Sequence, residues 1–148
     1  MRFPYTRIDA TQPTRPYVNL FLRSGFATTD TVYGLVDSGA DYPIFPLHFA
    51  NTLKLNLTEG RPWSFRGTTG QLQIAYLHEV EMSVWDAENE NLAFRFNTIV
   101  SFCPDFQFPG GSLLGQEGFL EHFTASFRKK DNYFDLEPLD RSIIVAAS

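Results

Sequence analysis

A single Asp-Ser-Gly tripeptide carries the clearest chemical signal in this sequence. Its aspartate, Asp37, follows a β-prone run over residues 31–36, so the carboxylate is expected where a buried strand opens into a tight turn. When two such carboxylates face each other, the pair retains one proton. The ionised member can then activate a water molecule, while the protonated member donates to a leaving group. The tripeptide therefore predicts general acid–base chemistry without a metal or a covalent intermediate.

The same tripeptide also has an interpretation as an ordinary turn. Asp and Ser side chains satisfy turn amides and Gly takes unusual dihedral angles, so Asp-Ser-Gly alone is far more often a turn than a site. Its surroundings favour a site, because an apolar strand precedes it and residues 44–46, Ile-Phe-Pro, lead toward a short helix. An exposed turn is rarely so enclosed. The candidate catalytic residues are Asp37, Ser38 and Gly39.

Strands are predicted to hold this turn, because hydrophobic residues recur with a period of two along most of the chain. The pattern covers residues 18–22, 74–84 and 92–96, with hairpin turns at 86–91 and 128–132. In the second run, the predicted core-facing side chains are Ile74, Tyr76, Val80, Met82 and Val84. Helical spacing occurs only at 47–53 and 116–123. The predicted fold class is all-β, with one domain spanning residues 1–148.

Two further glycine-bearing segments follow the tripeptide. Residues 63–70, Trp-Ser-Phe-Arg-Gly-Thr-Thr-Gly, precede a long alternating strand and are predicted to form a hairpin. Two interpretations of Trp63 and Phe65 within it stay open, lining a cleft or packing under the hairpin, and packing is favoured because aromatic residues in β proteins are usually core. Farther on, Leu113-Leu114-Gly115 comes directly before residues 116–123, one of the two stretches with helical spacing.

These segments, in this order, resemble the retropepsin-like aspartic proteases. That family ends its active-site strand with two hydrophobic residues, Asp, Ser or Thr, Gly, Ala and often a further Asp, and residues 35–41 match every position. Leu113-Leu114-Gly115 resembles the family's second signature, and residues 63–70 resemble its glycine-bearing flap. Arg15-Pro16 resembles the basic-Pro start of its first core strand. The resemblance covers about residues 15–136.

The resemblance implies a lobe with a flap hairpin and a short helix after Leu113-Leu114-Gly115. It also implies an aspartic endopeptidase, in which water activated by two Asp37 side chains hydrolyses a polypeptide substrate without a cofactor. The implied substrate-binding residues are Ala40, Asp41, Gly67, Thr68, Thr69 and Gly70. The implied structural support comes from Leu113, Leu114 and Gly115. Many relatives carry a basic residue where this chain has Gln116, so an ion pair from that position to Asp41 is not expected.

One Asp-Ser-Gly tripeptide supplies only half of a carboxylate pair. The later acidic residues are not followed by Ser-Gly or Thr-Gly. The second carboxylate is therefore expected from another copy of the chain, which predicts a homodimer with Asp37 facing its mate across a two-fold axis. The apolar tail at 142–145, Ser-Ile-Ile-Val, suits either a sheet between subunits, as in retroviral relatives, or an edge strand of its own subunit.

Composition and charge exclude other partners. The net charge of −5 and the absence of a Lys- and Arg-rich block argue against nucleic acid. The sequence has no run of about 18 apolar residues, so no membrane span is expected, and its first residues lack the apolar core of a signal peptide. We expect a cytoplasmic protein.

The remaining reactive residues do not form another site. His48, His78 and His122 have no partners at metal-ligand spacing, so no metal is expected. Cys103 cannot form an internal disulfide and is interpreted as a packed thiol.

Two alternatives to the protease remain open. In the first, a retropepsin-like fold serves as a dimeric protein-interaction module whose Asp37 pair is weak or silent. In the second, a small β-barrel binds apolar ligands. Peptide cleavage that depends on Asp37 distinguishes the enzyme from both.

Overall fold

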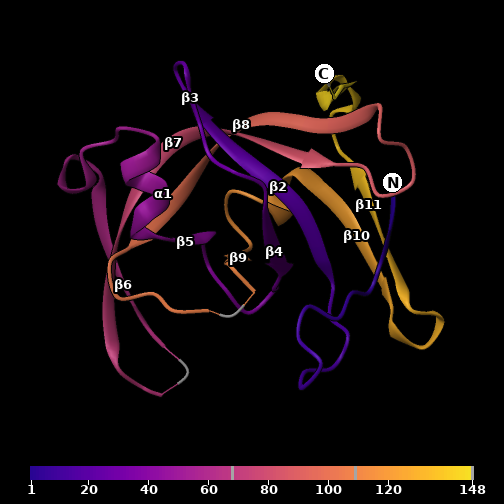
Figure 1. The fold of residues 1–148 in the computed structure, drawn as a ribbon, viewed down its shortest axis with the longest axis horizontal. Coiled ribbons are helices and arrows are strands. Elements are labelled where there is room, and N and C mark those ends of the chain that lie inside the picture. The colour runs from indigo at the N-terminus through magenta and orange to yellow at the C-terminus, as the bar shows by residue number, and fades with distance from the viewer. Residues whose placement is uncertain (68, 109, 148) are drawn as a thin grey trace.

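The computed structural model describes residues 1–67, 69–108 and 110–147, and strands make up most of them (Figure 1). The strands are β1 (Arg2–Pro4), β2 (Tyr17–Ser24), β3 (Ala27–Thr28), β4 (Val32–Val36), β5 (Ile44–Pro46), β6 (Arg61–Arg66), β7 (Leu72–Trp85), β8 (Leu92–Cys103), β9 (Ser112–Leu114), β10 (Phe123–Arg128), β11 (Tyr133–Pro138) and β12 (Ile144–Ala146). The helices are α1 (Leu47–Thr52) and the 3-10 turns η1 (Leu57–Glu59), η2 (Leu120–His122), η3 (Lys129–Asp131) and η4 (Arg141–Ile143). This is the all-β class that the sequence predicts.

A closed barrel forms the body of the molecule. Neighbouring strands pair in the order β8, β5, β9, β4, β2 and β7, and β7 pairs again with β8 to close the ring. Most of these pairs are antiparallel, but β4 runs parallel to β9 and β5 runs parallel to β8. Closure leaves no free edge among these strands. The long strand β7 extends beyond the barrel and pairs with β6 to form the flap hairpin.

The parallel pairing of β4 with β9 positions the Asp-Ser-Gly turn. Gly34 lies opposite Ser112, and Val36 lies opposite Leu114. A Cβ atom on Gly34 would lie 2.7 Å from a side-chain carbon of Leu114 and 2.8 Å from one of Leu20, so only glycine fits here without a shift. Because of this register, the residue after Val36 and the residue after Leu114 leave the sheet side by side.

The two chain ends lie outside the barrel. Strand β1 pairs with β11 and β11 with β10 in a separate three-stranded sheet. The tail predicted at 142–145 contributes to β12, which pairs antiparallel with β8 of the same chain, with Ile144 opposite Phe94. In this single chain, the tail is therefore an edge strand of its own subunit.

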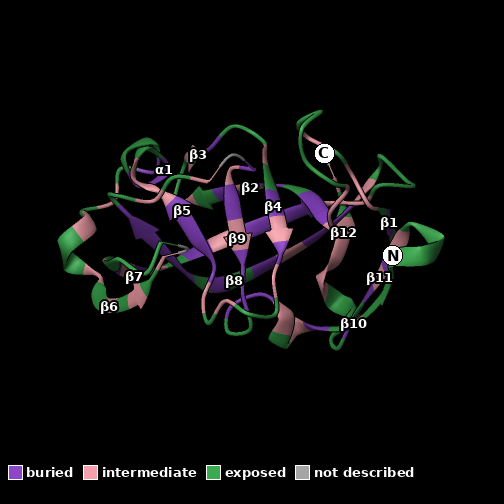
Figure 2. Ribbon diagram, turned by 90° about the horizontal axis from the view of Figure 1, so that it is seen from below, coloured by how far each residue is buried: buried purple, intermediate pink, exposed green. Residues whose placement is uncertain are grey.

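Phenylalanine dominates the core. The fully buried phenylalanines are Phe3, Phe45, Phe94, Phe102, Phe119 and Phe134. Burying each such side chain contributes about 1.5–3 kcal/mol. Figure 2 shows the buried stretches concentrated in the barrel strands. A second, smaller cluster consists of Ile44, Ala75 and Cys103, with Trp63, Phe65, Phe106 and Leu113 packed against it.

The predicted inward face of β7 is correct in only one half of the strand. Met82 and Val84 are fully buried, as predicted. Ile74, however, is 51% exposed, whereas Ala75 is fully buried. The reason is that this end of β7 has left the barrel and pairs with β6, so its inward side chains contact the second cluster instead of the barrel core. Tyr76, predicted to face the core, is only half-buried.

The two helical segments differ in outcome. The segment at 47–53 forms α1, as its spacing predicts. The segment at 116–123 contains only the 3-10 turn η2. An α-helix does not form because Gly118 takes a positive φ of 83°, and the N–H groups of Leu120 and Glu121 donate to carbonyl oxygens five residues back instead of four.

Candidate active site

The Asp37 carboxylate is held by its own turn. The backbone N–H of Asp37 donates to the carbonyl oxygen of Leu114 over 2.9 Å, which fixes the turn to the end of β9. The N–H of Gly39 donates to Asp37 Oδ1 over 2.8 Å, and the N–H of Ala40 donates to the Asp37 carbonyl oxygen over 3.2 Å. Asp37 is half-buried and Ser38 is exposed. The turn thus orients the carboxylate while leaving it accessible.

A second set of bonds fastens the loop that follows. The side chain of Gln116 donates through Nε2 to the Ser38 carbonyl oxygen over 2.7 Å. Its backbone N–H donates to Ala40 O over 2.9 Å, and the next N–H, of Glu117, donates to Asp41 O over 2.8 Å. At position 116, this chain therefore uses an amide to hold the loop backbone.

The close approach of these two segments requires a glycine at position 115. A Cβ atom there would lie 2.6 Å from the Ala40 carbonyl oxygen and 2.9 Å from backbone atoms of Tyr42. Such distances are shorter than any real Cβ contact, so a side chain would force backbone atoms apart. The predicted role of Gly115 as structural support therefore has a steric basis. Leu114, predicted in the same role, is fully buried.

The flap is the antiparallel hairpin of β6 and β7. At its tip the N–H of Gly67 donates to Gln71 O, and the N–H of Gly70 donates to Gly67 O, both over 2.9 Å. Arg66 Nη1 donates to Gly70 O, also over 2.9 Å. Gly70 has a φ of 80° and open space around it, which suits a flexible tip. Gly67 does not have a positive φ, so backbone conformation does not explain why residue 67 is a glycine.

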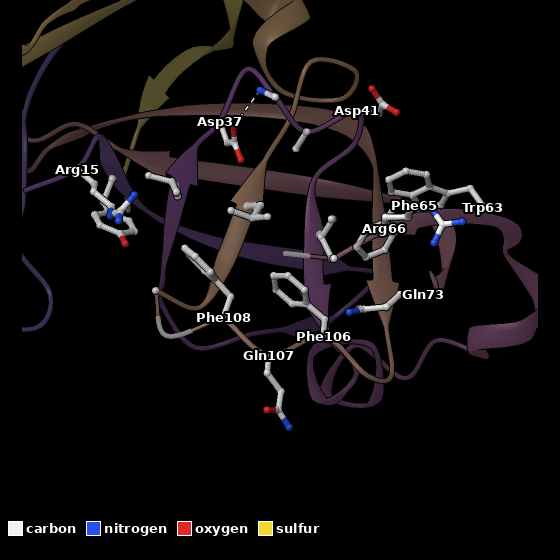
Figure 3. A pocket seen from close by; sticks show the side chains of 18 of the residues that line it. Arg15, Asp37, Asp41, Trp63, Phe65, Arg66, Gln73, Phe106, Gln107 and Phe108 are labelled. Atoms are coloured by element: carbon white, nitrogen blue, oxygen red, sulfur yellow. Dashed lines mark hydrogen bonds between the residues drawn. The ribbon is translucent and has the colours of Figure 1, made fainter. Parts of the chain in front are cut away.

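Between the flap and the Asp37 turn lies a groove of about 980 Å³. Figure 3 shows Asp37 on one wall, Phe106 and Phe108 across from it, and Trp63, Phe65 and Arg66 at one side. The remaining lining residues are Ile8, Gln12, Arg15, Tyr17, Leu35, Gly39, Ala40, Asp41, Ile44, Ser64, Gly67, Gln73, Gln107, Gly110 and Leu113. Its walls combine apolar side chains with nearly as much polar surface, so the groove can bind a ligand that carries both kinds of group.

Aromatic rings build one side of the groove. The rings of Trp63 and Phe65 are stacked with centroids 5.0 Å apart, and Tyr42 meets Trp63 edge-on at 5.0 Å. Trp63 and Phe65 line the groove and also pack on the second cluster, so both interpretations of these side chains are correct. The indole N–H of Trp63 is buried without a partner among the described residues.

The structure brings many, but not all, of the predicted site residues to the groove. Those that line it are Asp37, Gly39, Ala40, Asp41, Gly67 and Leu113. Ser38, Thr69, Gly70, Leu114 and Gly115 are not among the lining residues, although Ser38 lies in the turn and Gly70 at the flap tip. Thr68 lies outside the described residues.

Sequence reasoning missed two other walls of the groove. One is the loop that carries Phe106 and Phe108, whose rings stack with centroids 6.2 Å apart. The other is an N-terminal loop carrying Ile8 and Gln12, closed by a bridge between Thr6 and Arg15. The Pro and Gly residues at 104–111, around Phe106 and Phe108, predict a connection between strands but do not indicate its path. The N-terminal loop carries no recognisable motif.

Burial affects the titration of two residues near the groove. Burial raises the pKa of the Tyr17 hydroxyl, an effect that nearby Arg15 partly opposes. Burial likewise raises the pKa of the Cys103 thiol, which donates to Gln73 Oε1 over 3.4 Å. Cys103 is thus a packed thiol, as predicted. Across the described ranges, no three His, Cys, Asp or Glu side chains are grouped to hold a metal ion, and no helix is long and apolar enough to cross a bilayer.

Comparison with known proteins identifies the fold. No protein family model and no curated protein matches the chain. Among solved structures, a retropepsin-like aspartic protease from Rickettsia conorii is similar over 90% of this chain and 97% of that one, with 19% identity and a TM-score of 0.56. EIAV protease complexed with the inhibitor HBY-793 matches 73% of this chain and 88% of that one, with 16% identity and a TM-score of only 0.41. On the first of these similarities, the chain has the retropepsin-like fold.

Proposed function

We propose that the chain is an aspartic endopeptidase that acts as a homodimer, with one Asp37 from each subunit. The observation that carries this proposal is the position of Asp37, whose half-buried carboxylate lies in a turn at the wall of a groove. One of its oxygens already accepts from Gly39 N–H, so the carboxylate is oriented before any substrate binds. Orientation of this kind lowers the entropic part of the barrier.

In the proposed reaction, two Asp37 carboxyl groups share one proton. The ionised group removes a proton from a water molecule as its oxygen attacks the peptide carbonyl carbon. The protonated group donates to the carbonyl oxygen, and a tetrahedral diol forms. When the C–N bond breaks, the group that took the water proton gives it to the leaving nitrogen. The other group removes a proton from a diol hydroxyl as the new carboxyl product forms, so the pair returns to its starting state. Ser38, exposed beside Asp37, braces the pair across the two-fold axis.

Substrate binds in this proposal as an extended strand between the flap and the Asp37 turn. An extended peptide places its side chains alternately on two faces, which suits a groove with walls on both sides. Ala40 and Asp41 contact the peptide from the turn, and residues 67–70 contact it from the flap. The aromatic side of the groove, Trp63 and Phe65, accommodates apolar side chains.

Cleavage of a peptide library at mildly acidic pH tests the activity. We expect cleavage that a statine-type inhibitor blocks and that Asp37→Ala abolishes. Sedimentation equilibrium at micromolar protein tests the assembly and is expected to give a dimer. A monomer at every concentration with full activity would overturn the two-fold arrangement, and cleavage that survives in Asp37→Ala would overturn the assignment of Asp37.

The second candidate is a dimeric protein-interaction module with a weak or silent Asp37 pair. The observation in its favour is the amide of Gln116, which bonds to Ser38 O and supplies no positive charge to Asp41. Peptide binding without cleavage by the wild-type protein would support this alternative over the enzyme.

A further inference from the structure

Resting on the proposed function, we infer that preferred substrates carry a carboxylate side chain close to apolar residues, and that Arg66 of the flap recognises that carboxylate. The peptide class is therefore acidic and apolar together, rather than apolar alone. The inference comes from the placement of one guanidinium and the chemistry of the walls around it.

Arg66 is the last residue of β6 and lies opposite Leu72 in the hairpin. Its side chain lines the groove, and Nη1 donates to the Gly70 carbonyl oxygen over 2.9 Å. This bond holds the Arg66 side chain against the flap tip. An arginine has five N–H donors, so one bond to a carbonyl leaves donors for a ligand.

No carboxylate of the described residues lies within salt-bridge distance of Arg66. The arginines that do form ion pairs in these ranges are Arg2, Arg95, Arg128 and Arg141. Arg66 is therefore a charge at a cleft wall with no acidic partner among the residues that the structure describes. A planar guanidinium binds a carboxylate through two parallel hydrogen bonds, which gives geometric selectivity as well as attraction.

The rest of the groove determines what accompanies the carboxylate. Figure 3 shows Arg66 on the side of Trp63 and Phe65, with Phe106 nearer the middle. Leu35, Ile44 and Leu113 add aliphatic wall. An extended peptide that presents an acidic side chain to Arg66 must therefore place its neighbouring side chains against apolar surface.

Two other charged residues at the groove are less suited to this role. Figure 3 shows Arg15 on the side of the groove opposite Arg66. Arg15 is half-buried in the N-terminal loop, so an incoming peptide reaches it less readily than an exposed arginine. Asp41 has the opposite sign and lies beside the Asp37 turn. Arg66 is exposed and on the flap, where an incoming peptide meets it.

The test compares matched peptides. A library of extended peptides with a central apolar pair is first digested by the wild-type protein, and the position most enriched in Asp or Glu is read by mass spectrometry. Two peptides that differ only by Glu or Gln at this position are then assayed for kcat/KM. We expect wild type to favour the Glu peptide by about three- to tenfold, the range for one charge-assisted pair at a partly exposed site.

In Arg66→Gln the Glu-to-Gln ratio of kcat/KM is expected to fall to about one. In Arg66→Glu this ratio should fall below one, and a third matched peptide with Lys at the same position should be cleaved faster than the Glu peptide. Arg61→Gln is the matched control, because Arg61 lies on the same strand but does not line the groove. It should keep the wild-type ratio. A ratio, unlike a single rate, is not changed by a loosened flap that slows both peptides equally.

The outcomes are separable. If wild type cleaves the Glu and Gln peptides equally, or if Arg15→Gln removes the preference and Arg66→Gln does not, the inference is wrong while the proposed function stands. If neither peptide is cleaved in an Asp37-dependent manner, the proposed function itself fails. A wild-type preference that disappears only in the Arg66 variants establishes the specificity.

Discussion

Two of the loops that line the groove are anchored in different ways. The turn after Asp37 is tied to residues 114–117, far away in sequence, by three backbone hydrogen bonds and the Gln116 side chain. At the flap tip, the hydrogen bonds found among the described residues join only residues 66–71. Long-range anchoring couples a loop to the stability of the whole fold, whereas local anchoring allows it to open by itself. The expected result is a fixed catalytic turn facing a deformable flap.

Asp37→Asn should give the largest effect, because it changes chemistry while preserving anchoring. Asparagine Oδ1 can still accept from Gly39 N–H, so the turn should stay folded. It cannot take a proton from water, so peptide cleavage should be lost, by at least about a hundredfold. Activity assays alongside urea unfolding measure both properties.

Asp41→Asn is the matched control, since it makes the same chemical change at the groove four residues later. Its loss of activity should be much smaller. If Asp41→Asn is as inactive as Asp37→Asn, catalysis depends on the loop as a whole and not on one carboxylate.

Gly115→Ala should have the next largest effect, and on stability. The new methyl group would lie 2.6 Å from the Ala40 carbonyl oxygen. A backbone atom, unlike a side chain, cannot avoid this contact by changing rotamer. We expect the free energy of unfolding to fall by about 3 kcal/mol, the upper range for overpacking. Urea unfolding monitored by tryptophan fluorescence measures it. A loss below about 1 kcal/mol would show that the turn is as deformable as the flap.

Gly70→Ala tests the flap side of the comparison. Gly70 has a φ of 80° but open space, so alanine should cost only the left-handed penalty of about 1–2 kcal/mol. Turnover should fall by more than this destabilisation explains, because flap motion accompanies substrate binding. Steady-state kinetics measures the turnover, and melting curves measure the stability.

The control for the flap is Gly25→Ala, in the hairpin between β2 and β3. Gly25 has a φ of 59°, and its surroundings are equally open, but it does not line the groove. It should lose similar stability and keep its turnover. Equal turnover losses in the two variants would mean that Gly70 has no special role in binding.

The same difference in anchoring explains what could be predicted from the sequence. The Asp37 turn has a strict local pattern, because it needs a strand, a carboxylate and a glycine in fixed order, and residues 35–41 predict it correctly. The bonds from Gln116 could not be predicted, since they depend on the parallel register of β4 and β9, which joins segments distant in sequence.

The walls of the groove were predicted least well. Ile74 was assigned to the core because period-two alternation does not indicate where a long strand leaves the barrel. Phe106 and Phe108 lie in a connection whose path is determined by packing against the second cluster, not by local preference. Residues that line a cleft therefore escape sequence patterns when loops supply them.

The smallest effect is expected in the three-stranded sheet of β1, β11 and β10, whose strands line no part of the groove. Arg2 forms two hydrogen bonds with the Asp135 carboxylate, at 3.0 and 3.3 Å, which lower the pKa of Asp135 below its usual value. A lowered folded-state pKa stabilises the protein above the unfolded pKa, near pH 4, and this stabilisation is lost as pH falls through the folded value. Asp135→Asn should therefore melt slightly below wild type at pH 7, and the two melting temperatures should converge as pH falls through the folded-state pKa of Asp135. Because the pair is largely exposed, the difference should be small and should shrink in high salt.

Arg2→Gln should show the same convergence, and the double variant should add nothing further. A difference that does not shrink as pH falls below the unfolded-state pKa, or an accompanying loss of peptide cleavage, would mean that this sheet contributes to the groove and is not independent of the two loops.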